Sequence, residues 1–129
     1  MDKPISALME KNVLTVNADD TVDRVEAIIS SHKLSFVPVI DSNGECFGVI
    51  SAPDLLHFHA MHKNPKADRA WEVCTHKVIE AGPDISVREA AELMVKNKIH
   101  HIVVIENKSI KGIISSIDIV NEYLLKQNT

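Results

Sequence analysis

Two short stretches of the chain place a serine three residues before an aspartate, GVISAPD at residues 48–54 and GIISSID at residues 112–118. Each stretch ends an apolar run and precedes a helical pattern, so its serine and aspartate match a capping box at a helix N-terminus. Such a terminus, with free amides and a hydroxyl, also binds a phosphate, and a carboxylate accepts hydrogen bonds from the two hydroxyls of a ribose. The spacing leaves two interpretations open, a helix cap alone or a cap that also binds a nucleotide.

The two stretches belong to an internal repeat that covers most of the chain. NVLTVNADDTV at 12–22 aligns with KVIEAGPDISV at 77–87, and KLSFVPVID at 33–41 aligns with KIHHIVVIE at 98–106. The alignment then shifts by one residue across the turn before GVISAPD, where a duplicated unit tolerates a change of length. The chain therefore contains two copies of one structural unit.

Each copy predicts the same order of elements. A short apolar run, 13–16 or 78–81, leads to Thr21 or Ser86, whose hydroxyl suits the N-cap of a helix. Apolar residues at helical spacing follow, and two β-branched runs joined by turn residues then predict an antiparallel hairpin. A second helix closes each copy, in LLHFHAMH and in IVNEYLLK. The predicted order is strand, helix, strand, strand, helix, written twice.

The predicted fold class is α+β, with two β-α-β-β-α repeats packed sheet to sheet around a pseudo-twofold axis. Because the strand runs are apolar at successive positions, both faces of each sheet should be covered. We assign 1–62 to repeat 1, 63–76 to a linker and 77–129 to repeat 2, whose N-terminal segment begins near residue 70, within one compact domain. The linker predicts a short helix around 67–73, with Trp71 anchoring the linker to the core.

Composition limits the class of protein. The 129 residues are 45% hydrophobic and 25% charged, with a formal net charge of -4 and no basic block, which indicates a globular domain and disfavours a nucleic-acid binder. No apolar run reaches the roughly 20 residues of a membrane span, and no secretion signal is present. Cys46 and Cys74 form no CxxC pair, so we expect reduced thiols and a cytoplasmic protein.

Catalysis and metal binding find little support in the sequence. There is no nucleophile elbow, P-loop or dinucleotide fingerprint, so we expect neither an enzyme nor a required cofactor. His57, His59 and His62 lie close together, but on a helix only His59 and His62 share a face, and no HExxH motif accompanies them. We predict a solvated helix end there and no metal site.

The repeated order of elements and the twice-written heptapeptide resemble a pair of cystathionine-β-synthase (CBS) domains, also called a Bateman module. The resemblance covers residues 4–62 and 70–125. It implies a pseudo-twofold disc that binds an adenine nucleotide (AMP, ADP or ATP) in the clefts between the repeats, with S-adenosylmethionine as a further candidate. It also implies a sensor that regulates an effector protein, and homodimers. The alternative is an interaction scaffold without a ligand, in which the serines and aspartates only cap helices.

The resemblance also implies the residues of two nucleotide-binding sites. In the first, adenine lies against Leu14 and the backbone of Ser35 and Phe36, while Asp54 binds the ribose and Ser51 lies on the phosphate side. The histidine pair of repeat 2 reaches this site from the other repeat. The second site uses Ile79, His100, His101, Ser115 and Asp118.

The two predicted sites are not equivalent. Where many members of the family carry a His-Arg pair, repeat 2 has His100 and His101, and repeat 1 has Ser35 and Phe36. A phosphate in the first site would meet two imidazoles, whereas one in the second would gain no charge, so we expect the first site to bind the charged nucleotide. Only a protonated imidazole carries charge, so affinity should rise from about pH 7.5 to about pH 6.

Overall fold

The chain folds into two compact units, each built around one three-stranded sheet. The computed structural model describes residues 1–76 and 78–127, and the assignments made for residues 77, 128 and 129 lie outside them. The repeat-1 unit comprises Leu14–Val78, and the repeat-2 unit comprises Met1–Val13 together with Ile79–Thr129. The first thirteen residues therefore pack with the second repeat, which the sequence did not predict.

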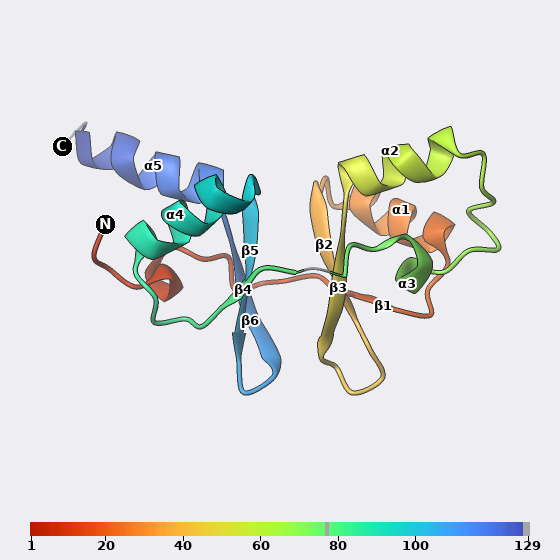
Figure 1. The fold of residues 1–129 in the computed structure, drawn as a ribbon, viewed down its shortest axis with the longest axis horizontal. Coiled ribbons are helices and arrows are strands. Elements are labelled where there is room, and N and C mark those ends of the chain that lie inside the picture. Colours follow the sequence, from red (N-terminus) through yellow and green to blue (C-terminus); the bar gives the residue numbers. More distant parts are fainter. Residues whose placement is uncertain (77, 128–129) are drawn as a thin grey trace. The chain divides into compact units, whose positions relative to one another are not determined.

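The repeat-1 unit has the predicted order of elements (Figure 1). Its elements are β1 (Val16–Asn17), α1 (Val22–Ser31), β2 (Phe36–Ile40), β3 (Cys46–Ser51), α2 (Ala52–Ala60) and the short helix α3 (Ala70–Val73). The sheet order is β1-β2-β3, with β1 parallel and β3 antiparallel to β2. The predicted hairpin is confirmed, but β1 starts at Val16, three residues later than expected.

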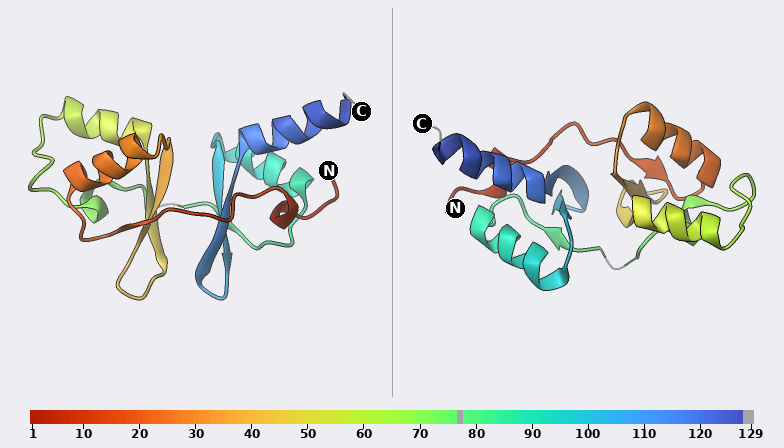
Figure 2. Two further views of the ribbon diagram at one scale, coloured as in Figure 1. Left: turned by 180° about the vertical axis from the view of Figure 1, so that it is seen from behind. Right: turned by 90° about the horizontal axis from the view of Figure 1, so that it is seen from above.

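The repeat-2 unit repeats this topology, with a 3-10 helix from the N-terminal segment added (Figures 1 and 2). Its elements are η1 (Ile5–Ala7), β4 (Glu80–Ala81), α4 (Val87–Asn97), β5 (His101–Glu106), β6 (Ser109–Ser115) and α5 (Ser116–Gln127). The sheet order is β4-β5-β6, again with one parallel and one antiparallel pair. The predicted α+β class with two β-α-β-β-α repeats is confirmed.

A short segment from outside each repeat hydrogen-bonds to the edge of the repeat's sheet. Thr75 pairs with Val49 of β3 through two backbone bonds of 2.8 and 3.0 Å, and Glu10 pairs with Ile113 of β6 through bonds of the same lengths. We call residues 74–75 and 9–10 the edge segments. They occupy equivalent places in the two units.

The glycine of each heptapeptide makes room for an edge segment. A Cβ at Gly48 would lie 2.6 Å from the backbone oxygen of Thr75 and 2.8 Å from Cys74 Sγ. A Cβ at Gly112 would lie 2.6 Å from Met9 Sδ and 2.9 Å from the backbone oxygen of Glu10. Because a backbone oxygen cannot move aside as a side chain does, only glycine fits at either position.

The core of each unit lies between its sheet and its helices. In the repeat-1 unit the buried cluster consists of Val16, Val25, Val37, Val39, Ile50, Ala70 and Cys74. In the repeat-2 unit it consists of Ile5, Val87, Ala90, Met94, Ile102, Val104, Ile114 and Ile119. Trp71 was expected to anchor the linker, but its side chain is 46% exposed, and Ala70 and Cys74 anchor the linker instead.

The two predicted helix caps differ. Ser86 accepts a hydrogen bond of 3.1 Å from the Glu89 amide and caps α4 as predicted. Thr21 lies at the N-cap of α1, but its hydroxyl donates to the Asp23 carboxylate and no amide bond to it forms. The hydroxyl therefore has the predicted position without the predicted bond. The Asp23 carboxylate lies nearby, and a carboxylate accepts a hydrogen bond from an amide more strongly than a hydroxyl does.

Gly48→Ala should lower the free energy of unfolding by about 1–3 kcal/mol, because the new methyl group displaces the backbone of the edge segment. Urea titration measures the loss. Gly82→Ala is the matched control, since a Cβ there meets nothing within 4 Å, and its effect should stay below about 1 kcal/mol. Equal effects of the two substitutions would contradict the close approach.

Candidate functional site

Ser51 and Asp54 lie at the junction of β3 and α2 in the repeat-1 unit. The Asp54 Oδ2 atom accepts the Ser51 amide at 2.9 Å and the Ser51 hydroxyl at 3.0 Å. This is a capping box at the N-terminus of α2, in which the serine hydroxyl also donates to the carboxylate. Asp54 therefore holds both the backbone and the side chain of Ser51.

Ser115 and Asp118 occupy the same place at the junction of β6 and α5, and they form a capping box as well. The Ser115 amide donates to Asp118 Oδ2 at 2.8 Å, and the Asp118 amide donates back to Ser115 Oγ at 3.2 Å. Among the described residues, the Asp118 carboxylate accepts only this one hydrogen bond. The predicted motif is thus present in both units, with different hydrogen bonding.

Thr75 is a residue at this site that the sequence analysis missed. Its hydroxyl donates to Asp54 Oδ1 at 3.0 Å, so both carboxylate oxygens of Asp54 accept hydrogen bonds. The equivalent residue of the repeat-2 unit is Glu10, whose Oε1 atom accepts the Asn12 amide at 2.8 Å. Extending the repeat alignment backward, which places residues 9–10 on 74–75, is the signal that could have found this pair.

The other predicted residues of each site lie on the strand beside the motif. In repeat 2, His101 pairs with Ser115 in the sheet register, and the Ser116 amide donates to the His100 carbonyl at 2.8 Å. In repeat 1, Phe36 pairs with Ser51, and the Ala52 amide donates to the Ser35 carbonyl at 3.3 Å.

Each unit therefore brings its own four motif residues together. The approach of the histidine pair to the first site involves both units and stays a prediction.

The pKa of His101 is lowered from its ordinary value. Partial burial disfavours the charged imidazolium, and the neighbouring His100 acts in the same direction, while Asp118 opposes both. His101 therefore carries less positive charge near pH 7 than an ordinary histidine does. His101 should therefore contribute less to the expected rise in nucleotide affinity toward pH 6 than a histidine with an ordinary pKa would.

The two residues predicted to contact adenine differ in exposure. Leu14, which begins the repeat-1 unit, has a side chain that is 42% exposed. Ile79 packs against the core of the repeat-2 unit, and its carbonyl accepts the Val103 amide at 3.4 Å. Leu14 thus offers apolar surface to a ligand, whereas part of Ile79 is already used in the core.

The remaining ionisable clusters have structural partners. His59 lies 2.8 Å from Glu26 of α1, and His62 follows the end of α2 with a φ of 56°, so helical spacing does not relate these two histidines. Among residues 1–76 and 78–127, no three metal-ligating side chains gather. Burial raises the pKa of the Cys74 thiol, with a further contribution from Asp54, and the thiol is protonated near pH 7.

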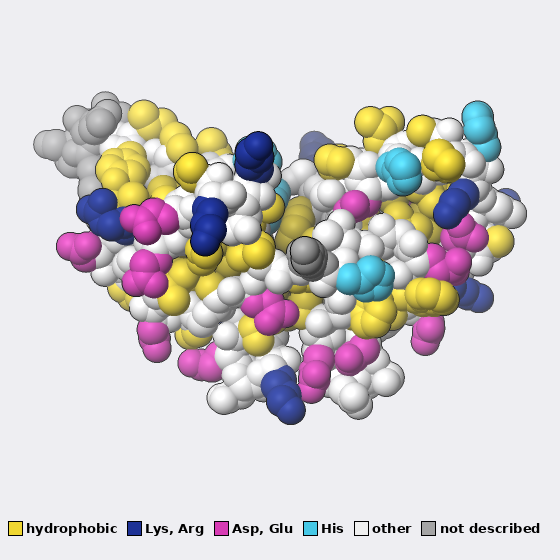
Figure 3. All heavy atoms as spheres, viewed as in Figure 1, with side chains coloured by type: hydrophobic (Ala, Val, Ile, Leu, Met, Phe, Trp, Pro, Cys, Tyr) yellow, Lys and Arg dark blue, Asp and Glu magenta, His cyan; other side chains and the backbone are white. Residues whose placement is uncertain are grey.

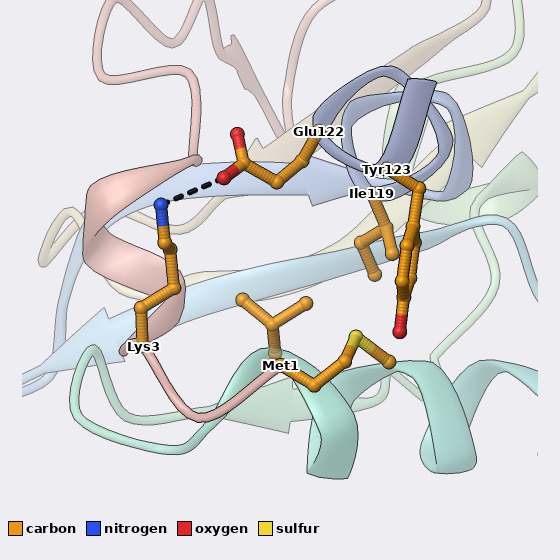
Figure 4. Close-up of a pocket in the computed structure, with 6 residues that line it drawn as sticks. Met1, Lys3, Ile119, Glu122 and Tyr123 are labelled. Atoms are coloured by element: carbon orange, nitrogen blue, oxygen red, sulfur yellow. Dashed lines mark hydrogen bonds and ion pairs between the residues drawn. The ribbon is translucent and has the colours of Figure 1, made fainter. Parts of the chain in front are cut away.

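A shallow hollow, open to solvent, lies between the N-terminal segment, α4 and α5 (Figure 4). It is lined by Met1 and Lys3 of the N-terminal segment, by Val87 of α4, and by Ile119, Glu122 and Tyr123 of α5. Lys3 Nζ lies 2.7 Å from Glu122 Oε1 and ties the N-terminal segment to α5. The hollow thus marks where the first residues pack on repeat 2. Within the described part of the chain, no helix is long and apolar enough to cross a membrane.

The family follows from a direct match. The family model for the CBS domain matches the chain twice, over residues 5–60 and 70–125. The chain belongs to the CBS domain family and carries a pair of these domains. CBS domain pairs are regulatory modules and usually have no catalytic activity of their own.

Relatives and solved structures of several kinds share this pair. Inosine-5'-monophosphate dehydrogenase of Methanocaldococcus jannaschii is 29% identical over 119 residues, which are 92% of this chain and 23% of the enzyme. The uncharacterized protein MJ1404 of the same organism is 25% identical over 92% of this chain. The chain spans 31% of its length. This chain is therefore similar to a minor part of either relative.

Two solved structures share the fold over nearly the whole chain. The CBS domain pair of protein MJ0100, in complex with 5'-methylthioadenosine and S-adenosyl-L-methionine, has a TM-score of 0.88 and 24% identity, covering 98% of this chain and 99% of that one. The CBS domain of a membrane protein from Sphaerobacter thermophilus has a TM-score of 0.82 and 26% identity, covering 93% and 87%.

The lowered pKa of His101 predicts a pH dependence of stability. Between the folded-state pKa and the unfolded value of about 6.5, the unfolded chain binds more protons, so the free energy of unfolding falls as the pH is lowered through this range. His101→Gln should make this fall smaller when urea titrations are run from about pH 7.5 to about pH 5. His57→Gln removes an exposed imidazole and controls for the loss of a histidine. An unchanged slope in His101→Gln would contradict the assignment.

Proposed function

We propose that this CBS pair is a regulatory sensor that binds an adenine nucleotide or a related adenosyl compound at the N-termini of α2 and α5. The observation that carries the proposal is the Ser115–Asp118 capping box, which presents a helix N-terminus together with a carboxylate oxygen that accepts no bond among the described residues. An aspartate in this state has acceptor capacity left for a ribose. The MJ0100 domain pair, which shares the fold, contains two adenosyl compounds in its structure.

The residues take distinct roles in the proposal. In the first site, Ser51 and the amides of α2 bind the phosphate, and Asp54 binds the ribose. The adenine contacts Leu14 and the backbone of Ser35 and Phe36. The histidine pair of repeat 2, His100 and His101, completes this proposed site. In the second site Ser115, Asp118 and Ile79 take the corresponding roles beside the same histidine pair. AMP, ADP and ATP are the first candidates, with S-adenosylmethionine next. The lowered pKa of His101 favours ligands whose affinity comes from ribose and adenine.

The rival function is an interaction scaffold in which both motifs only cap helices. The hydrogen bonds of Asp54 favour this rival for repeat 1, since they satisfy both carboxylate oxygens within the unit. The two functions differ in one observable. A ligand that binds only the folded state stabilises it by about 2.7 kcal/mol at one hundred times its dissociation constant, whereas a scaffold gains nothing.

Thermal unfolding should separate the two functions. At least one of AMP, ADP, ATP, S-adenosylmethionine and 5'-methylthioadenosine should raise the melting temperature of the wild type by a few degrees. The double variant Asp54→Asn with Asp118→Asn should lose this shift, because neither site keeps its carboxylate. Glu92→Gln, at an exposed carboxylate of α4, is the control and should retain it. An unchanged melting temperature of the wild type with all five compounds would contradict the sensor function and support the scaffold.

The predicted homodimer is part of the proposal. Exposed apolar side chains gather on α2 and α5, including Leu56 at 72%, Leu125 at 65% and Ile117 at 58%, and Figure 3 shows apolar surface over both helices. Exposed apolar area of this kind is typical of interaction surfaces. Sedimentation at several concentrations tests the dimer. The cytoplasmic location, the effector protein and the absence of nucleic-acid binding stay predictions.

A further inference from the structure

We propose that Thr75 is a specificity-determining residue, which withdraws Asp54 from ribose binding and directs the adenosyl ligand to Asp118 of repeat 2. This inference rests on the proposed function and deepens it by assigning the ligand to one of the two motifs. It differs from the expectation drawn from the sequence, which favoured the first site because of the histidine pair.

The hydrogen bonds of Asp54 leave little acceptor capacity on its carboxylate. Oδ2 accepts both the amide and the hydroxyl of Ser51, and Oδ1 accepts the hydroxyl of Thr75 at 3.0 Å. A carboxylate offers roughly four lone-pair positions over its two oxygens. A ribose that bound through both of its hydroxyls would have to displace Thr75 or share Oδ1 with it.

The carboxylate of Asp118 has more capacity left. Ser115 directs its hydroxyl toward the Asp118 amide as an acceptor, so only the Ser115 amide donates to Oδ2. Oδ1 accepts no hydrogen bond among the described residues. The two hydroxyls of a ribose can therefore bind Asp118 without breaking a bond of the helix cap.

A difference between the edge segments accounts for the bond to Oδ1, which Asp54 accepts and Asp118 lacks among the described residues. Thr75 and Glu10 occupy equivalent positions, since they pair with Val49 and Ile113 and pass the glycines of the two heptapeptides. The threonine hydroxyl donates to the neighbouring aspartate, whereas an ionised glutamate has no proton to donate. Glu10 instead accepts the Asn12 amide at 2.8 Å.

The residue that pairs with each serine in the sheet also favours repeat 2 as the ligand site. His101 pairs with Ser115, and Phe36 pairs with Ser51. A neutral imidazole has one donor and one acceptor nitrogen, whereas a phenyl ring has neither. The serine of the motif therefore lies beside a polar ring in repeat 2 and beside an apolar ring in repeat 1.

Calorimetry with adenosine and 2'-deoxyadenosine tests the inference, because the ratio of the two affinities reports the ribose contact directly. The wild type should prefer adenosine by about ten-fold, as expected for a hydrogen bond to a charged group. Asp118→Asn should abolish this preference, while its matched counterpart Asp54→Asn should retain it. Asparagine keeps an acceptor for the serine amide, so the helix caps stay in place, and thermal unfolding verifies the fold of each variant.

Two substitutions at the edge segments test the cause. Thr75→Val in the Asp118→Asn background should raise the affinity of the remaining site for adenosine by about five-fold, because Asp54 Oδ1 becomes available. Glu10→Thr in the wild type places a donor beside Asp118 and should weaken adenosine binding by a similar factor.

Loss of the preference in Asp54→Asn but not in Asp118→Asn would overturn the inference, while the proposed function would stand. A weaker affinity for adenosine when Thr75→Val is added to the Asp118→Asn variant would also overturn it, since Thr75 would then contact the ligand itself. If the wild type bound none of the adenosyl compounds, the proposed function would fail and this inference with it.

Discussion

The close approach of the edge segments to Gly48 and Gly112 is the constraint on which the rest of each unit depends. A Cβ at either glycine would overlap a backbone oxygen of the segment, so the strand and the segment can hydrogen-bond only because both repeats carry glycine there. The same contact extends each sheet by one pair and fixes residue 10 or 75 beside the strand that leads into the capped helix. Packing at the glycine thus determines which side chain can reach the aspartate six residues later.

Helix capping and ligand binding compete for the same atoms. The aspartate that holds the serine amide of the cap is also the group that would accept a ribose, and each hydrogen bond it makes inside the protein reduces what it offers to a ligand. Asp54 makes three such bonds and Asp118 makes one. A duplicated motif can therefore serve stability in one repeat and recognition in the other, although five of its seven positions hold the same or a similar residue type.

Local patterns in the sequence were sufficient to predict the order of elements, because helical periodicity, the hairpin turns and the Ser-Asp spacing each act within a few residues. The edge segments could not be predicted in this way, since the pairing of Glu10 with Ile113 joins positions far apart in the chain and has no local signature. Trp71 was misassigned because large apolar residues are usually buried, whereas the small Ala70 fills the core. The unequal bonding of Asp54 and Asp118 depends on where hydroxyl groups point, which residue type alone does not determine.

Amide resonances followed by nuclear magnetic resonance during a titration with AMP test the central claim most directly, because they report each helix N-terminus separately. The account predicts that the amides of Ser115, Ser116 and Asp118 shift at lower AMP concentrations than those of Ser51, Ala52 and Asp54. Shifts that appear first at Ser51 and Asp54, or that stay absent from both helix N-termini at saturating AMP, would contradict it.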